Sequence, residues 1–166
     1  MAQVTHPILG AIDPTAPGFW DVDVTFGGRA VTVDLTIEEL ELPPSVLRDL
    51  PQSLRDLEAL DRAARAAILS DAQSGDDDAA SVLYLTHHYE VLSSEDYQRL
   101  FGVSAPDLAN PQPTLSRLAL VRVGLYPEQE RRRILLDYSI DPDATNYILC
   151  VSFDSNGEPI AVDLES

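Results

Sequence analysis

Residues 19–37, FWDVDVTFGGRAVTVDLTI, decide the fold that the rest of the chain completes. Apolar and polar residues alternate on both sides of Gly27-Gly28, which is the pattern of two half-buried strands joined by a two-residue turn. The apolar face comprises Trp20, Val22, Val24 and Phe26 from the first strand and Val31, Val33, Leu35 and Ile37 from the second. The turn also sets the register, so Asp21 is expected directly opposite Asp34, on the face that Asp23 shares.

The middle of the chain is predicted to be helical. Residues 44–50 form a short helical turn, and residues 52–72 form the main helix, with Pro51 in its first turn. An apolar stripe at helical spacing comprises Leu54, Leu57, Leu60, Ala64, Ala67 and Ile68. Charged residues, Arg65 among them, fall mostly on the opposite side. We therefore expect this helix to cover the sheet with its apolar stripe.

Two further helices are expected before the chain returns to strands. The first spans about residues 79–92, with Val82, Leu85, Tyr89 and Leu92 along one side. The second begins near Ser93 and stops at Gly102, which is a natural helix end. Residues 103–113 contain three prolines and are predicted to be loop.

The C-terminal third is predicted to be β-rich. Strands are expected at residues 115–126, 132–140, 147–153 and 160–164. A tight turn at Asn156-Gly157 would pair Phe153 with Ile160, Val151 with Val162 and Leu149 with Leu164. Near the N-terminus, the short apolar run 6–12 is expected to be an edge strand, since Pro7 fits only near the start of a strand or at an edge.

The order of strands, helices and then strands is typical of an α+β fold. We expect one domain over residues 1–166, with a single antiparallel sheet of about five or six strands and helices packed on one face.

Charge is the strongest compositional feature. The chain has 11 basic and 28 acidic residues, which give a net charge of −17. A field of this sign repels nucleic acids and anionic membranes and permits a basic protein partner, although acidity can also serve solubility alone. The sequence shows neither a signal peptide nor a membrane span, and a cytoplasmic location is expected.

The carboxylates of Asp21, Asp23 and Asp34 are the first candidate binding site. Like charges directly opposite one another on a sheet destabilise it, so something has to offset Asp21 against Asp34. Solvent exposure, a basic residue of this chain or of a partner, and a divalent cation are the three alternatives. Metal-binding motifs are absent from the sequence, so no metal or cofactor is predicted.

The loop residues Asp76, Asp77 and Asp78 are the second candidate for partner contact, with helix capping or plain solvation as the alternative. His87 and His88 are adjacent on a helix, so their side chains diverge and cannot easily bind one metal. Cys150 lies in an apolar run and is expected to be a buried, inert thiol. The sequence contains no recognisable catalytic motif, and no catalytic residue is predicted.

An ordered set of short motifs runs through nearly the whole chain. It consists of HPILG (6–10), Trp20 with the Gly27-Gly28 hairpin, LEALD (57–61), LVRVGLYP (120–127), LDYSI (136–140) and the ending from Phe153-Asp154 through Gly157 to Leu164-Glu165-Ser166. In this order the set resembles a family of small bacterial proteins classed as a domain of unknown function (DUF2004-like). The resemblance implies a bacterial cytosolic protein and brings no catalytic residues.

These observations favour a non-enzymatic, acidic protein-binding domain, similar in size and charge to immunity proteins that neutralise toxins. The alternative is a small-molecule-binding domain or small enzyme with a pocket between helices and sheet. A pocket that places His87, His88 or Tyr89 beside a carboxylate would favour this alternative. A structural homo-oligomer is a third possibility, which a large apolar surface patch would favour.

Overall fold

The structure is a computed structural model of the chain, and its residues 3–38 and 42–166 are described. The strands are β1 (Val4–His6), β2 (Gly10–Ile12), β3 (Gly18–Phe26), β4 (Arg29–Ile37), β5 (Ala119–Leu125), β6 (Ile134–Ser139), β7 (Ile148–Phe153) and β8 (Pro159–Glu165). The helices are α1 (Pro44–Arg48), α2 (Leu54–Ala72), α3 (Ala80–Val91), α4 (Ser94–Phe101) and α5 (Gln112–Leu115). The α+β class is therefore confirmed.

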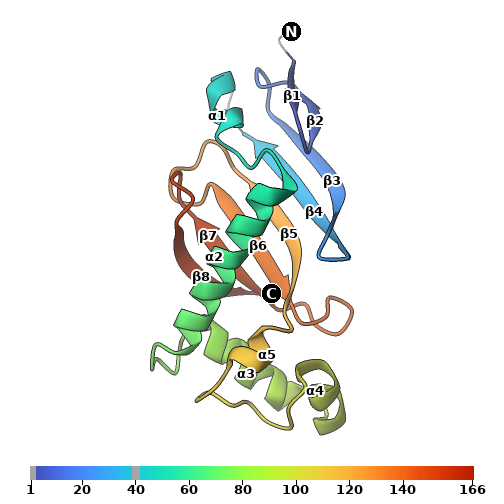
Figure 1. The fold of residues 1–166 in the computed structure, drawn as a ribbon, viewed down its shortest axis with the longest axis vertical. Helices are drawn as coiled ribbons and strands as arrows, with labels where there is room; N and C mark the ends of the chain where they lie inside the picture. Colours follow the sequence, from blue (N-terminus) through green and yellow to red (C-terminus); the bar gives the residue numbers. More distant parts are fainter. Residues whose placement is uncertain (1–2, 39–41) are drawn as a thin grey trace.

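The main sheet has six strands in the order β3-β4-β5-β6-β7-β8 (Figure 1). It is mixed, because β4 and β5 run parallel while every other neighbouring pair is antiparallel. The expectation of a purely antiparallel sheet is wrong at this one junction. After β4 the chain travels back along α2, as Figure 1 shows, so β5 starts from the same end of the sheet as β4. A helical crossover of this kind produces a parallel pair.

The first two strands form a separate two-stranded sheet. The run 6–12 was expected to be one edge strand, but the chain turns within it and pairs Val4 with Ile12. The His6 ring, 2 % exposed, stabilises this turn: its Nδ1 accepts hydrogen bonds from the backbone N–H groups of Ile8 and Leu9, both at 3.3 Å.

The β3–β4 hairpin has the predicted register along its whole length, including Asp21 opposite Asp34. Gly27 and Gly28 have φ angles of 57° and 78°, which other residues rarely adopt. Two successive residues of positive φ form the turn type whose twist matches that of the strands. The four apolar residues of β4 are at most 2 % exposed, so the apolar face of the hairpin contributes to the core as predicted.

Helix α2 runs across one face of the sheet, in front of β6 and β7 in Figure 1. Its N-cap is Ser53, which forms a capping box with Asp56, so Pro51 precedes the helix and is not in its first turn. Leu57, Ala64 and Ile68 are buried as predicted. Leu54, however, is the first residue of the helix and is 44 % exposed.

Helices α3, α4 and α5 lie at one end of the sheet, at the bottom of Figure 1, whereas α1 lies at the other end, near β1. The buried side of α3 differs from the predicted one, because Tyr89 is 45 % exposed while Tyr84 and His88 are buried. The polar atoms of these two side chains have partners, so they occupy the core at low cost. The α4 helix ends at Gly102, as predicted, in the left-handed conformation.

The C-terminal strands form an antiparallel meander, β5 to β8. The predicted pairs Val151–Val162 and Leu149–Leu164 are confirmed. The pair Phe153–Ile160 is wrong, since an irregularity after Ser152 places Phe153 opposite Pro159 and leaves Ile160 44 % exposed. Residues 112–115, partly assigned to a strand, form the short helix α5.

A buried polar link attaches α2 to the sheet. The Tyr138 hydroxyl on β6 donates a 2.7 Å hydrogen bond to Asp61 Oδ1 on α2. Asp61 also accepts from Nε of Arg65, at 3.1 and 3.0 Å, and the Arg65 Cζ atom lies 5.2 Å from the centre of the Tyr138 ring. Burial, together with the Asp61 charge, raises the pKa of Tyr138 well above its ordinary value, so the phenol stays a donor.

The variant Tyr138→Phe should therefore lose about 1–3 kcal/mol of unfolding free energy, because Asp61 loses a hydrogen bond at a half-buried carboxylate. Urea denaturation measures the loss. The control is Tyr89→Phe, at an exposed site, which should change the free energy by less than about 0.5 kcal/mol. Equal effects of the two substitutions would contradict the assigned link.

Candidate functional site

The second face of the sheet carries the three carboxylates that the sequence singled out. Asp21 and Asp23 are exposed on the edge strand β3, where Phe19 and Thr25 share their face. Asp23 accepts a 2.7 Å hydrogen bond from the Thr32 hydroxyl across the hairpin. Asp34 differs from both, because it lies on β4, one strand further in, and is 2 % exposed.

The guanidinium of Arg122, on β5, neutralises Asp34. Its Nε and Nη2 atoms donate to the two oxygens of Asp34, the second bond measuring 2.9 Å. Nη1 donates to Asp137 on β6 at 3.1 Å, and Nη2 also donates to the Tyr126 hydroxyl at 2.7 Å. The offset that the Asp21–Asp34 pair requires is therefore a basic residue of this chain, which was one of the three alternatives.

The pKa of Arg122 reflects two opposed effects. Burial lowers it, but the hydrogen bonds to Asp34, Tyr126 and Asp137 outweigh burial and raise it above its ordinary value. Arg122 is thus a permanent cation between two buried carboxylates. Asp137 keeps one oxygen, Oδ1, without a hydrogen-bond partner among the described residues.

Gly124 makes room for this cluster. A Cβ atom at this position would lie 2.9 Å from Arg122 Nη2 and 3.0 Å from the Tyr126 ring. The guanidinium and the phenol therefore lie against the bare backbone of β5. The sequence contained a signal for this shared face, because Arg122, Gly124 and Tyr126 alternate with apolar residues. The partners Asp34 and Asp137 could not be identified from this local pattern.

The second predicted patch, Asp76 to Asp78, is exposed. It lies in the loop after α2, at the lower left of Figure 1, whereas β3 lies at the right, so the structure does not bring the two acidic patches together. The Asp76 carboxylate accepts a 2.9 Å hydrogen bond from the backbone N–H of Asp78 and stabilises its own loop.

The histidines serve packing and hydrogen bonding within the fold. His88 is 1 % exposed; its Nδ1 lies 2.6 Å from the Tyr84 carbonyl oxygen and its Nε2 lies 2.8 Å from the Thr145 hydroxyl. Nδ1 must therefore donate to the carbonyl, and Nε2 accepts from Thr145 in the neutral ring. Burial lowers the pKa of His88, which favours this neutral form. His87 is half-buried, and the centre of its ring lies 4.2 Å from the centre of the Tyr147 ring.

Cys150 is fully buried, as predicted. Burial, and then the neighbouring Asp137 charge, raise the pKa of its thiol well above the ordinary value. A thiol that stays protonated is a poor nucleophile and a poor metal ligand. Across residues 3–38 and 42–166, no group of three or more histidine, cysteine or acidic side chains is arranged to hold a metal ion.

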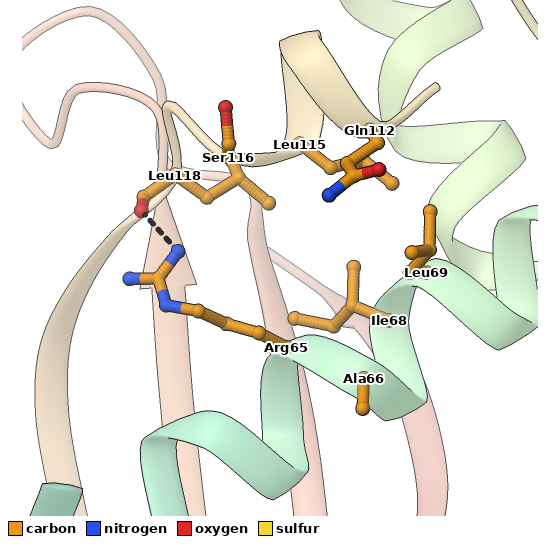
Figure 2. Close-up of a pocket in the computed structure, with 8 residues that line it drawn as sticks. All are labelled: Arg65, Ala66, Ile68, Leu69, Gln112, Leu115, Ser116 and Leu118. Carbon is orange, nitrogen blue, oxygen red and sulfur yellow. Dashed lines mark hydrogen bonds between the residues drawn. The ribbon is translucent and has the colours of Figure 1, made fainter. Parts of the chain in front are cut away.

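Two of the cavities that α2 helps to line are large enough for a small ligand. The first, of about 450 Å³, lies between α2 and α5 and is lined mainly by apolar side chains (Figure 2). The second, of about 570 Å³, is lined by the hairpin turn, the start of β5 and the end of α4, and contains Arg29, Arg65 and Arg117. Sequence analysis did not identify this group of arginines, since they are separated along the chain. None of His87, His88 and Tyr89 lines either cavity.

Comparisons with protein-family models, with curated proteins and with solved structures found no match. Among the helices of the described residues, none combines the length and the apolar character that a membrane crossing requires. Any function has to follow from the residues of this chain.

Replacing Arg122 by methionine should leave two buried carboxylates without their cation and lower the unfolding free energy by about 3–5 kcal/mol. Denaturant titration measures the loss. The control is Arg131→Met at an exposed loop position, which should change the unfolding free energy by less than about 0.5 kcal/mol. Adding Asp34→Asn and Asp137→Asn to Arg122→Met should restore part of the loss, and a triple variant no more stable than Arg122→Met would argue against charge burial as its cause.

The lowered pKa of His88 predicts a specific pH dependence. The unfolded chain takes up a proton near pH 6.5, before the folded chain does, so the stability from the neutral ring is present above that pH and is lost below it. In His88→Gln, the difference in unfolding free energy between pH 8 and pH 5 should be smaller than in the wild type. His87→Gln is the matched control, and the same pH difference in all three proteins would exclude His88 as its source.

Proposed function

We propose that this chain is a non-enzymatic protein-binding domain that presents strand β3 to a basic partner. The observation that carries the proposal is the exposed row Phe19, Asp21, Asp23 and Thr25 on an edge strand of the main sheet. We call this row the acidic β3 strip.

The acidic β3 strip combines three properties that a docking site needs. Asp21 and Asp23 supply negative charge that Arg122 does not neutralise, since its bonds go to Asp34 and Asp137. Phe19, 62 % exposed, supplies an apolar anchor next to them. An edge strand also offers backbone N–H and C=O groups to an added strand. A basic, extended segment of a partner protein fits this combination.

Asp34 is left out of the proposed contact surface because it is buried. The loop Asp76 to Asp78 stays a second candidate, for a separate contact. His88 and Cys150 are the side chains whose chemistry could have suggested catalysis. Both ring nitrogens of His88 are hydrogen-bonded within the fold and Cys150 is buried, which supports a binding role.

An immunity-like role is part of this proposal. A protein that neutralises a basic toxin gains speed and selectivity from negative charge, and a net charge of −17 supplies a strong field. A bacterial cytoplasmic setting, which the resemblance noted in the sequence implies, would suit such a role.

The test uses a partner captured by the wild-type chain from native lysate and then purified. The double variant Asp21→Lys/Asp23→Lys should slow association roughly tenfold or more at low salt, and the difference should shrink at high salt as screening grows. Association rates between about 20 and 300 mM salt measure both effects.

The matched control is Glu90→Lys/Glu95→Lys, which makes the same change in net charge at exposed sites on α3 and α4. If both double variants slow association equally, only the overall charge matters and the strip is not the contact. Unchanged rates in the β3 variant would remove the proposal.

A further inference from the structure

The second cavity gathers positive charge in a strongly acidic protein. Three segments far apart in the chain contribute an arginine each: Arg29 from the start of β4, Arg65 from α2, and Arg117 from the turn before β5. Asp61 is the one carboxylate among the residues that line this cavity. We call it the arginine cavity; its volume is about 570 Å³, within the usual range of small-molecule sites.

Arg65 is held in a fixed position. Its Nε donates to Asp61 and its Nη1 donates to the Leu118 carbonyl at 3.1 Å. Among the described residues Nη2 of Arg65 has no hydrogen-bond partner, and Figure 2 shows this side of the guanidinium pointing away from the first cavity. A guanidinium that the fold already orients loses little conformational entropy when it binds an anion.

Arg117 is also held by the fold. Its Nη1 donates to the Leu100 carbonyl at 2.9 Å, and its guanidinium lies against Gly102, where a Cβ would come within 2.7 Å of Cζ. The acceptor is a neutral carbonyl at the end of α4, so no carboxylate of the described chain pairs with this charge.

Arg29 completes the group. It lies two residues before Val31 on β4, so its side chain starts on the α2-covered face of the sheet. Within residues 3–38 and 42–166 its guanidinium makes neither an ion pair nor a hydrogen bond. Asp61 balances Arg65, and Arg29 and Arg117 therefore leave the cavity two positive charges in excess. An oxyanion would balance them with bidentate hydrogen bonds.

The first cavity adjoins the arginine cavity, since Arg65, Ser116 and Leu118 line both. Its other walls include Ile68, Leu69 and Leu115, which surround the space beside the Arg65 stem in Figure 2. A polar, cationic compartment thus meets an apolar compartment of about 450 Å³.

We infer that the two cavities together bind a small amphiphilic anion. Its oxyanion head, a phosphate or a carboxylate, contacts Arg29, Arg65 and Arg117, and its apolar group occupies the space between α2 and α5. This site is independent of the acidic β3 strip, because it lies on the other face of the sheet and needs the opposite charge. It is also the position between helices and sheet where the alternative reading of the sequence expected a pocket.

Calorimetric titration with inorganic phosphate, octyl phosphate and octanoate tests the inference, at fixed ionic strength and below micelle-forming concentrations. Octyl phosphate should bind at least roughly tenfold more tightly than inorganic phosphate, because only it buries an apolar chain. Octanoate against octyl phosphate distinguishes a carboxylate from a phosphate head. Absence of saturable binding by both alkyl anions would overturn the site, and equal affinity of inorganic and octyl phosphate would overturn the two-cavity assignment.

Arg29→Gln is the decisive variant, since the Arg29 side chain has no hydrogen bond or ion pair with the described residues to lose. It should weaken binding of the alkyl anion roughly tenfold, while Arg131→Gln, at an exposed position in the loop between β5 and β6 that does not line the arginine cavity, should leave it unchanged. Arg117→Gln should behave like Arg29→Gln. Equal weakening by Arg29→Gln and Arg131→Gln would show non-specific attraction and overturn the assignment.

Discussion

The guanidinium of Arg122 joins the two halves of the main sheet. In the strand order of the described residues, the hairpin β3–β4 and the meander β5–β8 are neighbours only at the β4–β5 pair, and Arg122 on β5 forms ion pairs with Asp34 on one side and Asp137 on the other. Either carboxylate, buried alone, would strongly disfavour folding. The parallel junction therefore depends on one cation that is itself held by three hydrogen-bonding side chains.

This cluster also determines which charges can act outside the fold. Asp34 is buried in an ion pair with Arg122, so Asp21 and Asp23 are the accessible carboxylates of the hairpin. On the opposite face, Asp61 fixes Arg65 and the phenol of Tyr138. The same principle thus operates on both faces, since an ion pair within the fold fixes some of the charged groups and other charged side chains stay outside it. The negative strip and the arginine cavity are kept apart by the sheet.

Local patterns predicted the elements well where one face of an element is buried. The alternation around Gly27-Gly28 gave a register that is correct at every pair, because a slip of one residue would reverse both faces. Prediction was weaker where apolar residues surround an element. In α3 the pattern allowed two buried sides, and the choice of Tyr84 and His88 depends on the distant partners Ile140 and Thr145. The order of the strands was not predictable either, since the position of β5 in the sheet depends on how the helices between β4 and β5 pack.

The sequence by itself determined the α+β class, the hairpin and its register, the main helix and the strong negative charge, because these follow from periodicity, turn chemistry and composition. Only the tertiary structure decided which charges are free. Asp34 has the same local pattern as Asp21 and Asp23, but its partner lies 88 residues away. Arg65 was expected on the exposed side of its helix, but it lines two cavities, and in the second of them Arg29 and Arg117 lie with it. Pairing between residues so distant along the chain depends on packing, which no local pattern encodes.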